Sequence, residues 1–498
     1  MRTRSTTGIP MSEKSMAKRM FIAGEWRDAS NGETMAVVNP ATEDVIATVP
    51  KGTEADAKAA ADAAQDAKKR VHKVTAWDRY QFLSKAARLL EEHQEEMARL
   101  ITLEAGKPIR DARIEARRAV ITFTYAAEEA KRIYGEVFPP DAYPLPPGNE
   151  NRIVFSVREP IGTVVCISPF NFPLNLLCHK VAPALAAGNC VIAKPTSETP
   201  LVAIRLVELL LEAGVPKDAV QIVTGPGRTV GNALVESPNT EAITFTGSTQ
   251  IGTQIASLGG KRAKRIILEM GGMDPVIILD DADLPRAVEA VARATFGLAG
   301  QVCIASKRIL AAEKIADQFS GLLADRVSKF KVADPGQEDT DIGPVISASS
   351  REFIHTLIME AKASGAKVKT GGDKLPGKGY FYKPTVLADV TSDMRVMQDE
   401  PFGPIGPVQS VASDEEAVEI ANSSMYGLQS SVYSRDLRRA LRLAREIKAG
   451  GVMINDPTTI RWDNMPFGGV KLSGLGREGV RYAIQEMTET KLINMNLA

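Results

Sequence analysis

Residues 242–249, AITFTGST, join a short apolar run to a helical pattern through one glycine. Similar apolar runs recur around it: TVVCI at 163–167, CVIA at 190–193, VQIV at 220–223 and VIIL at 276–279. In chain order the first four runs are each followed by a helical pattern, as at 200–213 and 249–258. Continuous Val/Ile runs that alternate with helices are typical of a parallel sheet buried on both faces. We therefore expect an α/β fold built on a doubly wound parallel sheet.

The chain on either side of this stretch shows two further patterns. Apolar and helical segments alternate again from residue 284 to about residue 453, which indicates a second α/β domain. Between residues 82 and 101, apolar side chains recur at helical spacing and predict one helix, which Gly106 and Pro108 terminate. A proline-rich crossing at 139–147 precedes the first run of the sheet.

The size and charge of the chain limit its function. Its 498 residues are too many for one core and predict about three structural units. Lys plus Arg and Asp plus Glu balance at 61 each, so no overall field favours nucleic acid or a membrane as partner. The longest apolar stretches, such as 202–211, are interrupted by charges well short of a membrane span.

The N-terminus and the cysteines indicate the compartment. Residues 1–20 carry Arg and Lys without the apolar run of a signal peptide, and we expect residues 1–18 to form a flexible arm. The four cysteines, at 166, 178, 190 and 303, have neither the density of a disulfide framework nor the spacing of a metal cluster. We expect a cytoplasmic protein with no bound metal.

The candidate chemistry lies just after the apolar runs, because parallel sheets bind ligands at the carboxyl ends of their strands. Gly247 permits close backbone approach, and Ser248 precedes a helix N-terminus that favours an anion such as a pyrophosphate. The spacing from Gly247 to Gly252 departs from the GxGxxG dinucleotide fingerprint. A tight turn without a ligand explains this junction equally well.

Three further side chains are candidates for chemistry, each with a structural alternative. Cys303, in GQVC, is a candidate nucleophile, although most cysteines are small core residues. Glu269 follows the run at 265–268 and is either a general base or a solvated strand end. Asn171, in SPFNFP, has an amide that can donate to an oxyanion or shape a turn. None of the three decides the function alone.

Together these motifs strongly resemble the aldehyde dehydrogenase superfamily in order and in flanking residues. The matches are SPFNFP at 168–173, KP at 194–195, FTGST at 245–249, LEMGG at 268–272, GQVC at 300–303, EPFGP at 400–404 and PFGG at 466–469. The resemblance runs from about residue 20 to the C-terminus. Seven motifs in register leave little room for chance.

The resemblance implies an aldehyde dehydrogenase-like α/β fold in three parts. An NAD(P)-binding domain with the doubly wound sheet is expected at 19–135 and 155–270, and an α/β catalytic domain with Cys303 at 271–480. Residues 136–154 and 481–498 are expected to form a small oligomerisation element. Family members are dimers or tetramers, so we expect a homodimer or a homotetramer.

The resemblance also implies a covalent mechanism. Cys303 attacks the aldehyde, hydride leaves for the nicotinamide, and Glu269 activates the water that hydrolyses the thioester. The side chain of Asn171 and the backbone N–H of Cys303 bind the oxyanion, and losing one such donor typically costs about 2.7–4 kcal/mol. Lys180 and Glu478 match a pair implicated in proton relay, although a structural ion pair explains both residues equally well.

The family's cofactor contacts map onto residues at the sheet edge. Lys194 matches the lysine on the cofactor ribose, Glu400 the carboxylate on the nicotinamide ribose, and Ser248 a pyrophosphate contact. Phe402 is expected near the nicotinamide. Further expected contacts are Ser168, Phe170, Gly227 and Gly247.

One departure from the family bears on the choice between NAD and NADP. Relatives that prefer NAD often carry Glu three residues after the ribose lysine, where this chain has Ser197, with Glu198 one place later. A carboxylate would repel a 2′-phosphate, whereas Ser197 permits it. Arg228 falls near the adenine ribose and can pair with that phosphate, or it is a solvated surface arginine. NADP is therefore permitted, and NAD is not excluded.

Three basic residues fall where relatives line the aldehyde tunnel: Arg118, His179 and Arg461. Buried cations without an anion are costly, so their convergence predicts a small substrate with a polar or negative end. Each one singly is equally well explained by an internal salt bridge. Residues 464–479 resemble members that act on lactaldehyde, glyceraldehyde 3-phosphate or phosphonoacetaldehyde. Val302 weakens the triose-phosphate interpretation, since those members usually carry Arg before the nucleophile.

Two other functions compete with hydrolytic aldehyde oxidation. A CoA-acylating member of the superfamily would resolve the thioester with CoA, but such members generally lack the base found here as Glu269. A silent structural protein on the same scaffold should have lost Cys303 or Asn171, and both are present. We therefore expect an NAD(P)-dependent dehydrogenase with a small-molecule aldehyde substrate.

Overall fold

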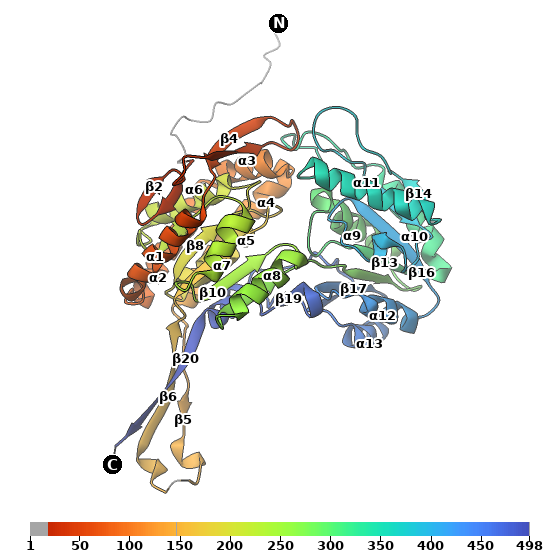
Figure 1. Cartoon of the computed structure of the whole chain (residues 1–498). Coiled ribbons are helices and arrows are strands. Elements are labelled where there is room, and N and C mark those ends of the chain that lie inside the picture. The colour runs from red at the N-terminus through yellow and green to blue at the C-terminus, as the bar shows by residue number, and fades with distance from the viewer. Residues whose placement is uncertain (1–17, 146, 498) are drawn as a thin grey trace.

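The computed structural model describes residues 18–145 and 147–497. The predicted flexible arm, residues 1–18, lies outside the described residues except for Lys18. Two α/β units lie side by side, and a narrow β-arm projects from them (Figure 1). No helix in the described part of the chain is both long and apolar enough to cross a bilayer.

The first unit is built on an eight-stranded sheet in the order β19-β11-β10-β7-β8-β9-β1-β2. Its five central strands are parallel, and β1, β2 and β19 pair antiparallel at the edges. The strands are β1 Met20–Ile22, β2 Glu25–Arg27, β7 Thr163–Ile167, β8 Cys190–Lys194, β9 Val220–Ile222, β10 Ala242–Thr246, β11 Arg265–Glu269 and β19 Gly474–Leu475. The predicted doubly wound parallel sheet is confirmed.

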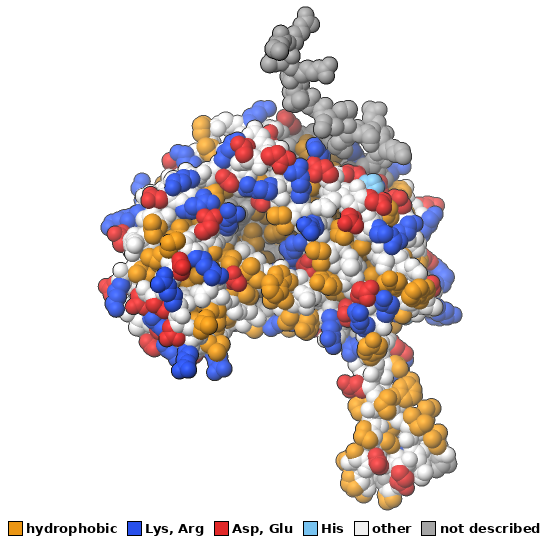
Figure 2. Space-filling model, turned by 180° about the vertical axis from the view of Figure 1, so that it is seen from behind, with side chains coloured by type: hydrophobic (Ala, Val, Ile, Leu, Met, Phe, Trp, Pro, Cys, Tyr) orange, Lys and Arg blue, Asp and Glu red, His pale blue; other side chains and the backbone are white. Residues whose placement is uncertain are grey.

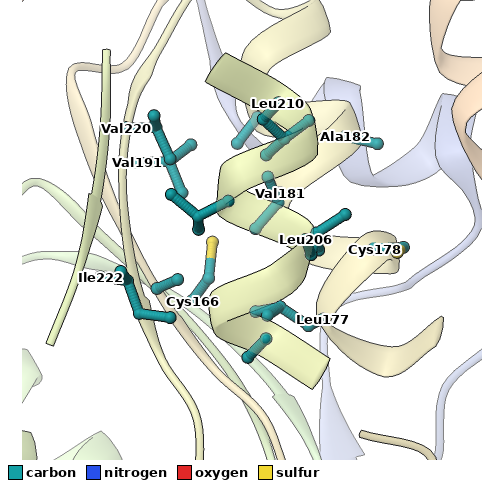
Figure 3. Packing of buried hydrophobic residues seen from close by; sticks show 14 of the residues in the cluster. Cys166, Leu177, Cys178, Val181, Ala182, Val191, Leu206, Leu210, Val220 and Ile222 are labelled. Atoms are coloured by element: carbon teal, nitrogen blue, oxygen red, sulfur yellow. The ribbon is translucent and has the colours of Figure 1, made fainter. Parts of the chain in front are cut away.

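The helices of this unit cover both faces of the sheet. They are α1 Glu54–Val71, α2 Ala76–Glu92, α3 Gln94–Ala105, α4 Ile109–Ala130, α5 Asn175–Ala186, α6 Leu201–Ala213, α7 Asn232–Glu236 and α8 Thr249–Gly260. The chain winds outward through β7, β8 and β9, then returns to β10 beside β7. Since crossovers are right-handed, α5 and α6 cover one face and α7 and α8 the other. Figure 3 shows side chains of α5 and α6, among them Val181 and Leu206, packed with the strand residues Cys166, Val191 and Val220.

Two sequence predictions in this region need correction. The single helix expected at 82–101 is two helices, α2 and α3, because His93 leaves the helical conformation and pairs through Nδ1 with Glu96 at 2.7 Å. Gly106 ends α3 in the left-handed conformation, as expected. The apolar run at 276–279 does not join the first sheet, whose fifth parallel strand is β11; the chain leaves that sheet at Gly271 and Gly272.

The second unit has a seven-stranded sheet in the order β14-β15-β16-β13-β12-β17-β18, parallel except for β14. The strands are β12 Pro275–Ile278, β13 Arg308–Ala312, β14 Lys367–Thr370, β15 Thr385–Ala388, β16 Ile405–Val411, β17 Gln429–Tyr433 and β18 Gly451–Ile454. The helices are α9 Leu284–Phe296, α10 Glu313–Val327, α11 Ala348–Ala363, α12 Asp414–Ser423 and α13 Leu437–Glu446. The second α/β region expected from the sequence is therefore present.

The projecting arm is a three-stranded antiparallel sheet in the order β20-β6-β5. Its strands are β5 Val137–Phe138, β6 Arg152–Pro160 and β20 Thr488–Asn496, and β6 pairs with β20 over its whole length. Helix α14, Val480–Glu486, leads into β20 and packs on α5. A separate hairpin, β3 Thr34–Val38 with β4 Val45–Pro50, lies near the N-terminus.

Candidate active site

The carboxyl ends of the first sheet bring most predicted cofactor residues to one edge. Ser168 follows β7, Lys194 ends β8, Gly247 follows β10, and Glu269 ends β11. These strands are neighbours in the order β11-β10-β7-β8, so the four residues form a row. In open α/β sheets this edge, where the strand order reverses, is where ligands bind.

Two buried donors on this edge are free to meet a ligand. The hydroxyl of Ser168 has no hydrogen-bond partner among the described residues. The ammonium of Lys194 donates only to the carbonyl of the adjacent Pro195, at 3.0 Å. Burial lowers the pKa of Lys194 to about 8, an effect that the nearby charge of Glu198 opposes. A polar ligand that accepts from both donors would relieve this cost.

The turn into α8 has the form of an anion-binding helix start. Ser248 is the N-cap, with its hydroxyl accepting from the N–H of Ile251 at 3.5 Å. A Cβ at Gly247 would lie 2.5 Å from the Phe245 ring, and a Cβ at Gly252 would lie 2.3 Å from the sulfur of Met270. Larger residues would displace this turn. Close packing and a helix N-terminus together fit a pyrophosphate group.

The second unit places Glu400 and Phe402 opposite this edge. Glu400 accepts from the N–H of Gly272 at 3.2 Å and pairs with Lys307 at 3.0 Å. A Cβ at Gly271 would lie 2.2 Å from a Glu400 carboxylate oxygen, so a side chain there would push the carboxylate from its present position. The Phe402 ring lies edge-on to Phe170, with centroids 5.7 Å apart, and Phe402 has a left-handed backbone (φ 40°). Such strain in a non-glycine residue is common at functional sites.

The loops after β8 and β9 meet at this edge of the first sheet. The hydroxyl of Ser197 donates to the carbonyl of Gly225 at 3.4 Å, which places it beside the loop that carries Gly227 and Arg228. Arg228 is exposed and makes no ion pair or hydrogen bond with any described residue. The neighbouring Glu198 turns its carboxylate to the Thr196 hydroxyl. The unpaired guanidinium of Arg228 therefore belongs to the loop beside Ser197, the position where NAD-preferring relatives often carry Glu.

Cys303, the predicted nucleophile, lies on a strained loop at the amino ends of the second sheet. Leu298, Ala299 and Gly300 adopt consecutive left-handed conformations (φ 52°, 52° and 71°) before the chain reaches Cys303. A Cβ at Gly300 would lie 2.0 Å from the carbonyl oxygen of Gly403, so only glycine fits there. The side chain of Asn171 donates through Nδ2 to the carbonyl of Gln301 at 2.9 Å. One amide hydrogen of Asn171 thus fixes the nucleophile loop, which leaves the second for an oxyanion.

Cys303 and Glu269 interact electrostatically across the two sheets. Burial raises the pKa of the Cys303 thiol well above its usual range, and the charge of Glu269 raises it further. Burial also raises the pKa of Glu269 to about 7, with repulsion from Glu478 adding to the effect and attraction to Arg461 opposing it. Neither oxygen of Glu269 has a hydrogen-bond partner among the described residues. A buried carboxylate poised near neutrality beside a thiol suits a general base.

Lys180 and Glu478 form the buried pair expected from the sequence. Their side chains meet at 2.6 Å, and Lys180 also donates to Thr246 at 2.7 Å. Glu478 also accepts a hydrogen bond from a second cation, Arg461, at 2.8 Å. Although burial alone would raise it, Lys180 and Arg461 hold the pKa of Glu478 well below its usual range. This geometry accommodates either a relay or a structural role.

The three basic residues predicted for the substrate are close together but paired. Arg118 and His179 both reach Asp463, at 2.7 and 2.8 Å, while Arg461 lies 2.9 Å from Nδ1 of His179. Burial, with repulsion from Arg461, lowers the pKa of His179 to about 4, so its ring is neutral. The internal salt bridges weighed as alternatives are therefore present.

A cavity of about 250 Å³ opens onto the nucleophile. Its walls include Cys303, Arg118, Arg461, Phe172 and Leu298, but not His179, which lies behind Arg461. The Nε–H of Arg461 has no acceptor among the described residues. The cavity thus brings the thiol together with the guanidinium groups of Arg118 and Arg461, and Arg293, Lys107, Asp111 and Glu115 also line it.

Sequence reasoning missed three residues of this site: Lys107, Lys307 and Asp463. Lys107 lines the cavity, pairs with Glu115 and lies over the Phe172 ring, 3.6 Å from its centroid. Lys307 contacts both the nucleophile loop and Glu400. Asp463 follows Arg461 by two positions, and a carboxylate so near a buried arginine was a usable signal.

Comparisons with known proteins agree with this geometry. Residues 26–493 match the model of the aldehyde dehydrogenase family. The chain is 42% identical over 478 residues to 3-sulfolactaldehyde dehydrogenase of Priestia aryabhattai, covering 96% of this chain and 98% of that protein. It is 41% identical to lactaldehyde dehydrogenase of Methanocaldococcus jannaschii, covering 95% and 99%.

Solved structures show the same fold. Betaine aldehyde dehydrogenase of Staphylococcus aureus, in complex with NAD+, superposes with a TM-score of 0.93 at 36% identity, over 97% of this chain and 95% of that one. A structure described as an Escherichia coli NADP-dependent enzyme also gives 0.93, at 38% identity, over 96% and 98%. The predicted family, fold class and enzyme class are confirmed: this chain belongs to the aldehyde dehydrogenase family and is an NAD(P)-dependent oxidoreductase.

Proposed function

We propose that the enzyme oxidises a small polar or anionic aldehyde to its carboxylate through a thioester on Cys303. The observation that carries this proposal is the cavity that joins the Cys303 thiol to the guanidinium groups of Arg118 and Arg461. The assigned roles of the site residues are part of the same proposal.

The protein's residues divide the reaction into two half-reactions. The sulfur of Cys303 bonds to the aldehyde carbon, while the Asn171 amide and the Cys303 N–H stabilise the oxyanion. A bound nicotinamide would supply the hydride acceptor, and Cys303 holds the thioester that remains once the hydride has left that carbon. Water then adds to the thioester as Glu269 takes its proton, the carbon–sulfur bond breaks, and the carboxylate leaves.

The residues of the first sheet edge fit a dinucleotide. Ser168 and Lys194 offer free buried donors, Gly247 and Ser248 form the anion-binding turn, and Glu400 stands opposite them. Arg228 would pair with a 2′-phosphate beside Ser197, so NADP is accommodated as well as NAD.

The substrate class rests on Arg118 and Arg461, which line the cavity beside Cys303. Guanidinium groups in a cavity favour a substrate that carries an oxygen or an anionic group. The similar proteins named above act on sulfolactaldehyde, which carries a sulfonate, and on lactaldehyde, which carries a hydroxyl. Succinate-semialdehyde dehydrogenase [NADP(+)] of Escherichia coli, 38% identical over 480 residues, acts on a carboxylate-bearing aldehyde. All three substrates are small and carry a polar group.

Assembly as a homodimer or homotetramer through the arm belongs to the proposal. Apolar side chains crowd the arm in Figure 2, and Val137, Tyr143, Leu145 and Leu492 are all strongly exposed. Exposed apolar surface of this kind marks an interaction site. The proposal also includes the expected division of the chain into an NAD(P)-binding domain, a catalytic domain and an oligomerisation element. The free thiols of all four cysteines are compatible with a cytoplasmic location.

The test is an aldehyde panel assayed by NADH and NADPH formation, with anionic, hydroxylated and plain alkyl aldehydes. Arg118→Met should lower kcat/KM for the anionic members about 10- to 100-fold, since a hydrogen bond to a charged group contributes about 1.5–3 kcal/mol. Plain alkyl aldehydes should be little affected. Arg110→Met is the matched control, because Arg110 lies on the same helix and pairs with Asp341 at 3.2 Å.

Three outcomes separate the alternatives. An equal loss on all aldehydes would assign Arg118 a structural role and remove the anionic substrate from the proposal. Acyl-CoA formation, with no carboxylate released in the absence of CoA, would identify the CoA-acylating alternative. No turnover of any aldehyde with either cofactor would favour a silent protein.

A further inference from the structure

Lys307 is a buried lysine for which the mechanism above has no use. It ends the nucleophile loop immediately before β13, and its side chain is only 2% exposed. Burial of an ammonium is costly unless the group is paired and hydrogen-bonded. The partners of Lys307 therefore indicate why the fold retains a cation at this place.

The ammonium of Lys307 joins the nucleophile to Glu400. It donates to the backbone carbonyl of Cys303 and pairs with the Glu400 carboxylate at 3.0 Å. The same carboxylate accepts from the N–H of Gly272, where an added Cβ would lie 2.9 Å from the Cys303 carbonyl oxygen. One cation thus fixes the main chain of the nucleophile and the proposed ribose-binding carboxylate in a single cluster.

The charges around Cys303 make this cation significant. Lys307 and Arg461 lower the pKa of the thiol, against the larger effects of burial and of Glu269. Arg461 is already paired with Glu478, which Lys180 also contacts. A second carboxyl group near Lys307 is Asp274, whose burial raises its pKa to about 8, an effect that the charge of Lys307 opposes. Glu400 is the carboxylate in direct contact with Lys307, at 3.0 Å.

We infer that Lys307 is a positioning residue that couples the state of Glu400 to the reactivity of Cys303. Glu400 and the Cys303 carbonyl share the ammonium of Lys307. When the hydroxyl groups of a ribose engage Glu400, the carboxylate holds the ammonium less tightly, and Lys307 turns its charge towards Cys303 and favours the thiolate. The link makes the nucleophile most reactive when the cofactor is bound. This last step rests on the proposed cofactor role of Glu400, whereas the coupling itself does not.

The test is a double-mutant cycle on the cofactor-free enzyme, read by the pH dependence of Cys303 alkylation with iodoacetamide. Mass spectrometry identifies the alkylated residue, and the other three cysteines are buried. Lys307→Met should raise the apparent pKa of alkylation by about one unit, which is about tenfold slower alkylation at neutral pH. Glu400→Gln should lower it by a similar amount. In the Lys307→Met background, Glu400→Gln should not lower the apparent pKa of Cys303 alkylation.

Further variants separate charge from shape. Lys307→Arg should restore a thiol pKa near that of the wild type, and Lys307→Gln, which keeps a donor for the Cys303 carbonyl, should behave like Lys307→Met. Lys314→Met, at a side chain 82% exposed, is the control. If Lys307→Met fails to fold, Lys307→Gln takes its place in the cycle. Equal lowering by Glu400→Gln in the wild-type and Lys307→Met backgrounds would overturn the inference, as would a Lys307→Arg enzyme that behaves like Lys307→Met.

A second readout adds NAD or NADP and repeats the alkylation, with binding measured separately by calorimetry. Bound cofactor should lower the alkylation pKa of the wild type and not that of Lys307→Met. A wild-type enzyme that binds neither cofactor would refute the proposed function, while the cofactor-free cycle would still decide the role of Lys307. A cofactor-induced shift preserved in Lys307→Met would refute the coupling alone.

Discussion

The two parallel sheets share an architecture but use opposite edges. In the first sheet the carboxyl ends of the strands carry Ser168, Lys194 and Gly247, with donors left free. In the second sheet Cys303 precedes β13 and Glu400 precedes β16, so the functional residues lie at the amino ends. The candidate active site lies where the carboxyl edge of one sheet meets the amino edge of the other, as the contacts of Asn171 with Gln301 and of Gly272 with Glu400 show.

The carboxyl edge of the second sheet is closed by its own side chains. Arg439 donates to Asp280 at 2.7 Å and to Asp414 at 2.8 Å. Asp281, after β12, accepts from the Ser434 hydroxyl at 2.8 Å and from two backbone N–H groups after β17. Groups that would otherwise bind a ligand are thus satisfied internally. Each of the two parallel sheets has a carboxyl edge that could bind a ligand. The internal pairing of polar groups decides which of these two edges remains open.

The largest expected effect is at the amino edge of the second sheet. Cys303→Ala should reduce aldehyde oxidation by at least about 10³-fold, because no covalent intermediate can form. Cofactor binding, which depends on the other sheet, should persist. Steady-state NAD(P)H formation and calorimetric titration measure the two properties. Loss of both together would show that the edges do not act independently.

The second largest effect is expected for Glu269→Gln, which should lower kcat about 10²–10⁴-fold. Since the pKa of Glu269 is about 7 and the base form is the active one, wild-type kcat should rise as pH increases through that value. The variant should lose this rise and accumulate the thioester, which intact mass spectrometry detects after a quench. A variant with an unchanged pH profile would assign the base to another group.

Asn171→Ala tests the contact between the edges, since Asn171 follows β7 but reaches the loop of Cys303. Removal of one oxyanion donor should lower kcat by about 10²–10³-fold with little change in KM. A rise in KM alone would instead indicate that Asn171 only orders the loop.

Arg228→Ala should have a modest effect confined to the carboxyl edge of the first sheet. KM for NADP should rise about tenfold, from loss of one charge-assisted contact, while KM for NAD stays the same. Arg262→Ala, at another arginine of this unit that forms no ion pair among the described residues, is a suitable control. Equal changes for both cofactors would place Arg228 away from the 2′-phosphate.

The smallest effect on activity is expected at the closed edge. Arg439→Ala should lower the free energy of unfolding by about 1 kcal/mol, as its ion pairs are only partly buried, and should leave kcat unchanged. Urea denaturation and the standard assay measure both quantities. A substantial loss of kcat would mean that this edge also serves the reaction.

Much of the fold and of the chemistry was predictable from local sequence. Continuous apolar runs such as TVVCI and AITFT, each followed by a helical pattern, predicted the parallel strands correctly. The run at 276–279 was placed in the wrong sheet because its pattern is the same in either. The break at His93 was missed because apolar spacing continues through it, while the interaction with Glu96 that accompanies the break depends on the folded chain.

The sequence by itself was enough to propose the nucleophile, the base and the cofactor turn, because these proposals depend on residue type within short motifs around Cys303, Glu269 and Gly247. Only the tertiary structure decided how charges are shared. Arg118 pairs with Asp463 and Lys307 with Glu400 across long stretches of chain, and no local pattern encodes such distances. Whether a buried cation is satisfied or still available to a substrate is a property of the space around it, which exists only after the two sheets have packed.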